Sequence, residues 1–211
     1  MELQLALDFV NMDEAIALME LMGTSVDIIE AGTPLLLREG TEVLRRLRAR
    51  NPKIRILADA KIVDGGYAEA KMLFDAGADI VTVLAVASSE TLAAVQSAAN
   101  ECAGIVAADM IASSQPLDDL AKVAAAGIQI ACVHRATDRG SWGTENSRLL
   151  EQVASAARSA GNLRIMVAGG LSLGTIPSVR SLSPDIVVVG GAIVSAADPA
   201  KAAREIRDAL Q

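Results

Sequence analysis

The chain has 211 residues, of which 52% are hydrophobic and 21% charged, so it can bury one sizeable core. Its formal net charge of -7, without any basic block, argues against nucleic acid as a partner, and aromatic residues at 2% leave the core to small aliphatic side chains. No apolar run reaches about 18 residues, no basic leader opens the chain, and the two cysteines are scattered, which together predict a reduced cytoplasmic protein without a membrane partner.

Short apolar runs alternate with longer amphipathic segments along the whole chain. The runs rich in β-branched residues or leucine predict strands over Leu3–Leu7, Val26–Ile29, Ile54–Ala58, Ile80–Leu84, Ile105–Ala108, Ile128–Val133, Arg164–Ala168 and Ile186–Val189. Apolar residues at helical spacing predict helices over Met12–Met22, Arg38–Arg50, Tyr67–Ala76, Glu90–Asn100, Leu117–Ala126, Glu145–Ala160 and Pro199–Leu210, with a weaker one over Thr175–Leu182.

Eight strand-helix units in unbroken succession predict an α/β fold, a (β/α)8 TIM barrel that forms one domain over residues 1–211. The alternative is an open doubly wound sheet. It is disfavoured because no G-x-G-x-x-G motif follows the first strand.

Ionisable residues stand at the ends of five of the predicted strands. They are Asp8, Glu30, Asp59 with Lys61 and Asp64 just beyond it, Asp109, and His134, the only histidine in the chain. A lone aspartate in such a place is commonly a helix cap, and a lone histidine is commonly structural. In a barrel, however, all these strand ends meet at one rim, where active sites of this fold lie. The convergence therefore predicts a functional rim.

Two glycine pairs follow the last two strands. They are Gly169-Gly170 and Gly190-Gly191. In this fold, backbone N–H groups after the seventh and eighth strands commonly bind a phosphate group. We therefore expect a phosphorylated substrate that these glycines bind.

The other rim residues predict chemistry on a carbonyl sugar. Glu30 and Asp59 are oxygen ligands on neighbouring strands, which suits Mg2+. Lys61 can stabilise an oxyanion, and His134 can transfer a proton near neutral pH. A metal ion, an ammonium group and a histidine around a phosphorylated substrate point to an enediolate intermediate.

The motif Asp-x-Lys-x-x-Asp, made by Asp59, Lys61 and Asp64, resembles the signature of the orotidine 5'-phosphate decarboxylase superfamily. The resemblance runs nearly from end to end, and within the superfamily it is to the branch of 3-hexulose-6-phosphate synthases and 3-keto-L-gulonate 6-phosphate decarboxylases. The segments that carry it are Leu3–Asp8, Val26–Pro34, Leu57–Lys61, Ala76–Asp79, Val133–His134, Val167–Gly170 and Val189–Ile193.

The resemblance implies roles for several of these residues. Glu30 and Asp59 match Mg2+ ligands, Lys61 matches the lysine that stabilises the enediolate, and His134 matches a proton-handling histidine. Asp64 matches an aspartate that reaches the active site of a partner subunit, which implies a homodimer with shared active sites. Lys61, His134, Asp64 and Asp59 are thus the expected catalytic residues. The expected substrate-binding residues are Asp8, Glu30, Asp109, Arg135 and the four glycines.

The two enzymes of this branch differ in substrate. A synthase joins D-ribulose 5-phosphate to formaldehyde, whereas the decarboxylase removes CO2 from a β-keto acid sugar phosphate. The segment Glu30–Leu35 and Gly191 resemble the synthase, which we take as the expected function. Arg135 and the pair Trp142-Gly143 resemble the decarboxylase, yet Thr137 stands where that enzyme carries a second arginine.

Two points stay open at this level. Arg135, Arg139 and Trp142 either tune substrate choice or belong to a solvated loop. A non-catalytic sugar-phosphate binder is a remote alternative, because a binder has no need for a buried lysine between carboxylates.

Overall fold

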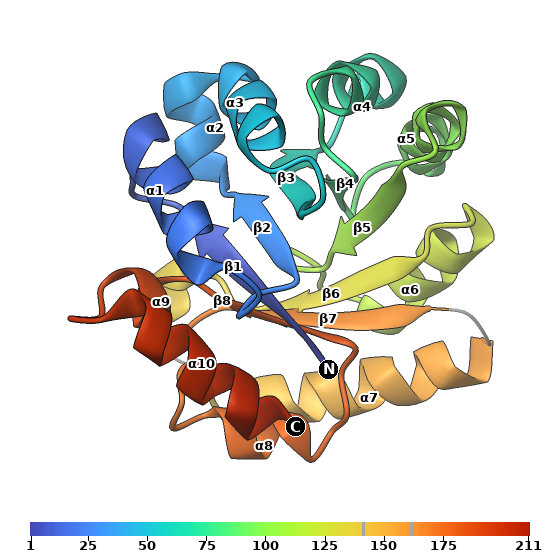
Figure 1. Cartoon of the computed structure of the whole chain (residues 1–211). Helices are drawn as coiled ribbons and strands as arrows, with labels where there is room; N and C mark the ends of the chain where they lie inside the picture. Colours follow the sequence, from blue (N-terminus) through green and yellow to red (C-terminus); the bar gives the residue numbers. More distant parts are fainter. Residues whose placement is uncertain (141, 161–162) are drawn as a thin grey trace.

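The computed structural model describes residues 1–140, 142–160 and 163–211. Eight parallel strands pair in sequence order and close into a barrel, with β8 paired to β1. Figure 1 shows the strands gathered at the centre and the helices outside them. The predicted (β/α)8 TIM barrel is confirmed. The strands are β1 Glu2–Leu7, β2 Ile28–Ala31, β3 Arg55–Ile62, β4 Ile80–Leu84, β5 Ile105–Asp109, β6 Ile130–His134, β7 Arg164–Ala168 and β8 Ile186–Val189.

Helices follow the strands and cover the outside of the barrel. They are α1 Met12–Met22, α2 Thr33–Glu39, α3 Glu42–Arg50, α4 Gly66–Asp75, α5 Ser89–Cys102, α6 Pro116–Ala125, the 3-10 helix η1 Thr137–Arg139, α7 Thr144–Ala160, α8 Ile176–Arg180, α9 Gly191–Val194 and α10 Pro199–Leu210. Within the described residues, no helix combines the length and the apolar composition that a bilayer crossing requires.

Alternate residues of each strand point into the barrel, where they form a packed interior. The even-numbered strands each contribute a buried isoleucine, namely Ile28, Ile80, Ile130 and Ile186. Side chains from alternate strands commonly form such layers in this fold. The outward faces of the strands pack against the helices in a second, larger apolar cluster. The barrel is therefore a filled core, and a site can form only at its ends.

An ion-pair cluster links three strands at their amino-terminal ends. Glu2 Oε2 on β1 accepts hydrogen bonds from Arg55 Nη1 at 3.1 Å and from Arg164 Nη2 at 2.9 Å. Arg55 begins β3 and Arg164 begins β7, so one carboxylate joins segments more than 50 residues apart in sequence. The pairs stabilise the end of the barrel opposite the predicted rim.

Several predicted boundaries were wrong. The single helix expected over Arg38–Arg50 is two helices, because Gly40 adopts a φ of 62° and ends α2 before α3 begins. The second strand, expected over Val26–Ile29, lies two residues later as β2. The third, expected to end at Ala58, continues to Ile62. The short helices η1 and α9 were not predicted, because segments of this length carry too little periodicity to detect.

Candidate active site

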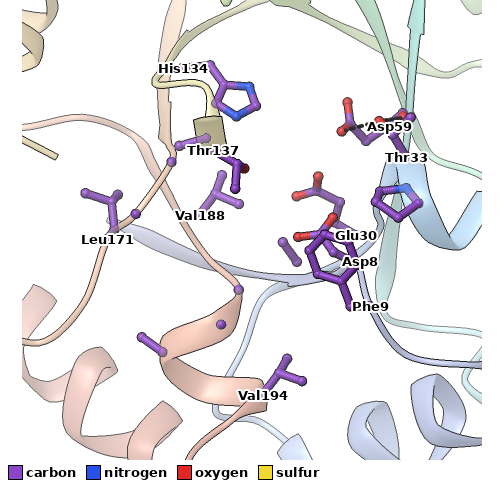
Figure 2. A pocket seen from close by; sticks show the side chains of 18 of the residues that line it. Asp8, Phe9, Glu30, Thr33, Asp59, His134, Thr137, Leu171, Val188 and Val194 are labelled. Atoms are coloured by element: carbon purple, nitrogen blue, oxygen red, sulfur yellow. Dashed lines mark hydrogen bonds between the residues drawn. The ribbon is translucent and has the colours of Figure 1, made fainter. Parts of the chain in front are cut away.

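A cavity of about 690 Å³ opens at the carboxyl-terminal ends of the strands. In Figure 2, Asp8, Glu30, Asp59 and Thr33 lie on one side of it, and His134, Thr137, Leu171 and Val188 lie on the other. The structure brings most of the predicted site residues together at this cavity, namely Asp8, Glu30, Asp59, Lys61, His134, Gly169, Gly170, Gly190 and Gly191.

Glu30 and Asp59 lie within strands, whereas Asp8 follows β1. Glu30 is the third residue of β2, and Asp59 and Lys61 lie in the second half of β3. In a strand, every second side chain points to the same face, so Leu57, Asp59 and Lys61 all point into the barrel. This explains why Asp59 and Glu30 are buried, with only 6% and 8% of their surface exposed.

The backbone of β3 is irregular where Lys61 lies. The pairing of β3 with β4 shifts between Ala58 and Ile62, and Lys61 adopts a φ of 49°. The backbone N–H of Lys61 donates to Thr82 Oγ1 at 2.9 Å instead of to a strand partner. Bulges and left-handed residues other than glycine often occur at functional sites, where they aim a side chain. Here the irregularity directs Lys61 into the cavity.

The ammonium group of Lys61 is surrounded by acceptors. Its Nζ forms an ion pair with the Asp59 carboxylate, donates to Thr33 Oγ1 at 3.2 Å, and lies 3.7 Å from Asp109 Oδ2. Burial by itself would lower the pKa of Lys61, but the charge and hydrogen bond of Asp59, followed by the charge of Asp109, raise it above its usual value. Lys61 therefore stays cationic in the cavity.

Two threonines hold the Asp59 carboxylate. Thr82 Oγ1 donates to Asp59 Oδ1 at 2.9 Å, and Thr33 Oγ1 lies 2.9 Å from Asp59 Oδ2. Sequence reasoning missed both residues. Thr82 points inward on β4, so the alternation of inward and outward side chains along that strand could have indicated it. Thr33 is the first residue of α2, so its position shortly after β2 was the signal for that residue.

Glu30 is a buried carboxylate with a single side-chain donor. Gln4 Nε2 donates to Glu30 Oε2 at 2.6 Å. Burial, together with the negative charge of Asp59, raises the pKa of Glu30 well above its usual range. Burial and Asp59 also raise the pKa of Asp8. Three acids that repel one another thus share one cavity with a single described lysine, Lys61.

A divalent cation would relieve this repulsion, and Glu30 and Asp59 could hold it. They offer carboxylate oxygens from adjacent strands to the same cavity. Mg2+ is commonly bound by one or two carboxylates, with substrate oxygens and water completing its shell. The donor set present here fits Mg2+.

His134 is oriented by Asp109. His134 Nδ1 lies 2.9 Å from Asp109 Oδ2, and Asp109 Oδ1 accepts the backbone N–H of Ile111 at 2.9 Å. Asp109 is 3% exposed and lies behind the cavity wall, so its position suits orienting the imidazole better than touching a substrate. The remaining ring nitrogen of His134, Nε2, is free to act in proton transfer.

The two glycine pairs form the part of the cavity wall that follows β7 and β8. Gly169 has a φ of 102°, and a Cβ there would lie 2.1 Å from the carbonyl oxygen of Arg135. Gly170 also has a positive φ, 66°. No atom lies within 4 Å of a Cβ built on Gly191, so the space in front of it is open to a ligand. This wall can accommodate an anion close to the backbone.

The structure does not bring Asp64 or Arg135 into the cavity of this chain. Asp64 is exposed, and its Oδ1 accepts the backbone N–H of Gly65 at 2.8 Å. Arg135 donates to the carbonyl oxygens of Gly140, at 3.0 Å, and of Arg139, and to Asn146 Oδ1 at 2.9 Å. Arg135 therefore ties together the loop between β6 and α7.

Trp142 and Arg139 belong to the same loop. Trp142 is buried and its Nε1 donates to Ser147 Oγ at 3.2 Å. The backbone carbonyl oxygen of Arg139 accepts a hydrogen bond from the guanidinium group of Arg135. Neither residue lines the cavity. Their contacts are those of a loop that packs against α7.

Comparisons with known proteins agree with the fold. Residues 1–206 match the orotidine 5'-phosphate decarboxylase / HUMPS family. The 3-hexulose-6-phosphate synthase of Bacillus subtilis (strain 168) is 36% identical over 211 residues, covering 100% of this chain and 99% of that protein.

Solved structures are similar over the same length. The crystal structure of 3-hexulose-6-phosphate synthase from Salmonella typhimurium matches with a TM-score of 0.92 and 40% identity, covering 100% of this chain and 98% of that one. KGPDC from Streptococcus mutans, solved as a ligand complex, matches with a TM-score of 0.91 and 30% identity, covering 99% of this chain and 96% of that one. The resemblance predicted from sequence is therefore confirmed. This chain is a lyase, and it belongs to the orotidine 5'-phosphate decarboxylase / HUMPS family.

Proposed function

We propose that this lyase is an Mg2+-dependent 3-hexulose-6-phosphate synthase that joins D-ribulose 5-phosphate to formaldehyde. The observation that carries the proposal is the cavity that Glu30, Asp59, Lys61 and the Asp109-bonded His134 line together. Full-length identity of 36% to a protein named as this synthase supports the choice of reaction.

Glu30 and Asp59 would hold the Mg2+ ion. When bound, the ion would supply positive charge beside two adjacent oxygens of the ketose phosphate. Thr33 and Thr82 keep the Asp59 carboxylate in place, and Gln4 does the same for Glu30.

The chain's own residues would then move one proton and stabilise one charge. His134 Nε2 takes the proton from C1 of the ketose, and Asp109 holds the imidazole in the orientation this requires. The Lys61 ammonium lies opposite the oxygen that becomes negative as the enediolate forms. C1 of the enediolate forms a bond to the formaldehyde carbon, and the new alkoxide oxygen takes a proton.

The phosphate group would lie against Gly169, Gly170, Gly190 and Gly191. Backbone N–H groups can reach an anion there because no Cβ stands between them and the cavity.

The contacts of Arg135 favour the synthase over the decarboxylase. This arginine was the main feature that resembled the decarboxylase, but its guanidinium group is bound to the loop and does not line the cavity. Thr137 and Gly191 do line it, in places where the decarboxylase is expected to carry arginines. The similarity to KGPDC from Streptococcus mutans keeps the decarboxylase as the second candidate.

The proposal also includes a homodimer in the cytoplasm with shared active sites. Asp64 is the residue that supports the homodimer. It belongs to the same motif as Asp59 and Lys61, yet it is exposed and does not line the cavity of its own subunit. A second copy of the chain would place the carboxylate of Asp64 at the neighbouring site.

The reaction is tested by product analysis of D-ribulose 5-phosphate with and without formaldehyde. We expect a hexulose 6-phosphate only when formaldehyde and Mg2+ are both present, and exchange of the C1 hydrogen with deuterated water when Mg2+ is present alone. Removal of metal with EDTA should abolish both signals, and added Mg2+ should restore them. Release of CO2 from 3-keto-L-gulonate 6-phosphate without any aldol product would establish the decarboxylase instead.

A further inference from the structure

Three side chains with metal-binding atoms meet beside the active-site cavity. Asp109 on β5 pairs directly in register with Cys132 on β6, and His134 lies two residues beyond Cys132 on the same strand. Residues two apart on a strand point to the same face, so all three side chains point into the barrel. One ligand atom of each lies within 4.8 Å of the others. Among the described residues, this is the one group of three or more such side chains.

The ligand set differs in kind from that of Glu30 and Asp59. A thiolate sulfur, an imidazole nitrogen and a carboxylate oxygen are the ligands of zinc sites, in which three protein ligands leave a fourth position open. Zinc bond lengths place such ligand atoms roughly 3.3–3.8 Å apart. Asp109 Oδ2 and His134 Nδ1, now 2.9 Å apart, would therefore separate slightly, and the Cys132 sulfur would approach them by up to about 1 Å. Side-chain rotation within a fixed backbone can supply this movement. An all-oxygen pair selects Mg2+, whereas a thiolate selects softer cations.

The group of three side chains reaches the cavity through His134. His134 lines the cavity, while Asp109 and Cys132 lie behind it, 3% and 4% exposed. The carboxylates of Asp8, Glu30 and Asp59 face the same space, and their combined charge exceeds that of Lys61, which lies 3.7 Å from Asp109 Oδ2. A divalent cation is therefore attracted to this end of the barrel.

Burial, together with the nearby negative charge of Asp109, raises the pKa of the Cys132 thiol well above its usual range. A bound cation reverses this, because a coordinating thiol loses its proton outright. The proton leaves to solvent, so one proton is released for each ion bound.

We propose that Asp109, Cys132 and His134 form a second metal site that takes a thiophilic divalent cation such as Zn2+, and that the bound ion inhibits the enzyme. Coordination draws Asp109 Oδ2 and His134 Nδ1 away from the hydrogen bond that orients the imidazole. The ion therefore removes the proton-transfer group from its working position while Glu30 and Asp59 remain available to Mg2+.

The site is tested by titration with Co2+, which reports thiolate coordination by a charge-transfer absorption band in the near ultraviolet. The titration needs no substrate, so its result is independent of which reaction the enzyme catalyses. We expect the band in the unmodified protein and its loss in Cys132→Ser, with Cys132→Ala as a second variant in case the first misfolds. Cys102→Ser is the matched control, since Cys102 lies at the end of α5 away from the cluster, and it should keep the band.

The second arm measures inhibition by Zn2+ with Mg2+ in excess, each variant relative to its own activity without zinc. We expect Cys132→Ser to need at least about 10-fold more Zn2+ for half-inhibition than the unmodified protein and Cys102→Ser. The Co2+ band should also persist in Glu30→Gln, which lacks one of the two carboxylates of the proposed Mg2+ site. The proposal is overturned if Cys132→Ser keeps the band, if Zn2+ inhibits Cys132→Ser and the unmodified protein equally, or if Glu30→Gln loses the Co2+ band.

Discussion

At the residue scale, Lys61 and Asp59 depend on each other. Each carries a charge in a largely buried position, and their ion pair compensates for lost hydration. Removing one partner leaves the other charge unpaired, which is more unfavourable than removing both. The pair also holds the ammonium group of Lys61 at the cavity wall.

We expect Lys61→Ala to lower turnover by at least about 100-fold, because a preorganised charge opposite the forming enediolate is lost. The measurement is kcat for the synthase reaction, with circular dichroism to show that the barrel still forms. Lys71→Ala is the matched control, since Lys71 pairs with Asp75 on the outside of α4. Near-normal turnover in Lys61→Ala would remove this residue from the catalytic set.

The sequence was informative about charged residues and silent about their partners. A carboxylate or an ammonium at a strand end is unusual enough to be noticed, so Glu30, Asp59 and Lys61 could be found. Thr33 and Thr82 could not, because threonine is common at helix starts and in strands for purely structural reasons. The direction of the Arg135 side chain could not be predicted for a related reason, since only the path of the loop shows which way it points.

At the element scale, the eight units could be predicted because each strand is a short apolar run that a helical period follows. The residues at which these strands and helices begin and end could not be predicted. Strand β3 continues past Ala58 through Asp59 and Lys61, because these charges are paired inside the barrel and do not end the strand. The break between α2 and α3 depends on the left-handed backbone at Gly40, a conformation that sequence periodicity does not reveal.

The end of β7 depends on glycine, so we expect Gly169→Ala to lower the free energy of unfolding by about 3 kcal/mol. Its φ of 102° is unfavourable for any residue with a Cβ, and the added methyl group would meet the backbone of Arg135 at 2.1 Å. The part of the cavity wall formed by Gly169 and Gly170 should also move, and we expect KM for the phosphorylated substrate to rise as a result. Urea denaturation and steady-state kinetics measure the two effects.

Gly174→Ala is the control for this substitution. The atom nearest to a Cβ at Gly174 is Ser172 Oγ at 3.9 Å, an ordinary contact. Its stability should stay within about 1 kcal/mol of the unmodified protein. Equal stability of Gly169→Ala and the unmodified protein would show that the wall does not require glycine.

At the scale of the whole molecule, the two ends of the barrel serve different purposes. The amino-terminal end carries charges that pair with one another, as Glu2 does with Arg55 and Arg164. At the carboxyl-terminal end, the carboxylates that line the cavity outnumber its described lysine, so a bound cation would balance their charge. Stability and function are thus placed at opposite ends, as is usual for this fold.

The Glu2 cluster should make stability depend on pH. Although burial by itself would raise the pKa of Glu2, its hydrogen bonds and ion pairs with Arg164 and Arg55 lower it below its ordinary value of 4.5. Its contribution is therefore present above about pH 4.5 and is lost as pH falls through the lower folded-state pKa.

We expect Glu2→Gln to lose on the order of 1 kcal/mol of stability at pH 7, and the difference from the unmodified protein to shrink as the pH falls below 4.5. Urea denaturation at several pH values measures this. Glu20→Gln, which breaks an exposed pair with Arg50 on the outside of the barrel, is the control and should change little. A difference that is independent of pH would mean that Glu2 acts through packing alone.

The proposed shared active site predicts complementation between two inactive variants. In a dimer of Lys61→Ala with Asp64→Asn, one site keeps Lys61 from one subunit and Asp64 from the other, while the second site lacks both. If subunits combine at random, half of the dimers are mixed and each has one intact site, so about a quarter of the full activity should return.

Lys61→Ala combined with Asp59→Asn is the control, because both groups serve the same subunit's cavity and no mixed dimer regains an intact site. Co-expression with two affinity tags isolates the mixed dimers, and about half of the full activity is expected in those of the first pair because one site of the two is intact. Inactive mixed dimers of the first pair, or a chain that remains monomeric while fully active, would rule out sharing and leave Asp64 as a surface residue of the β3–α4 turn.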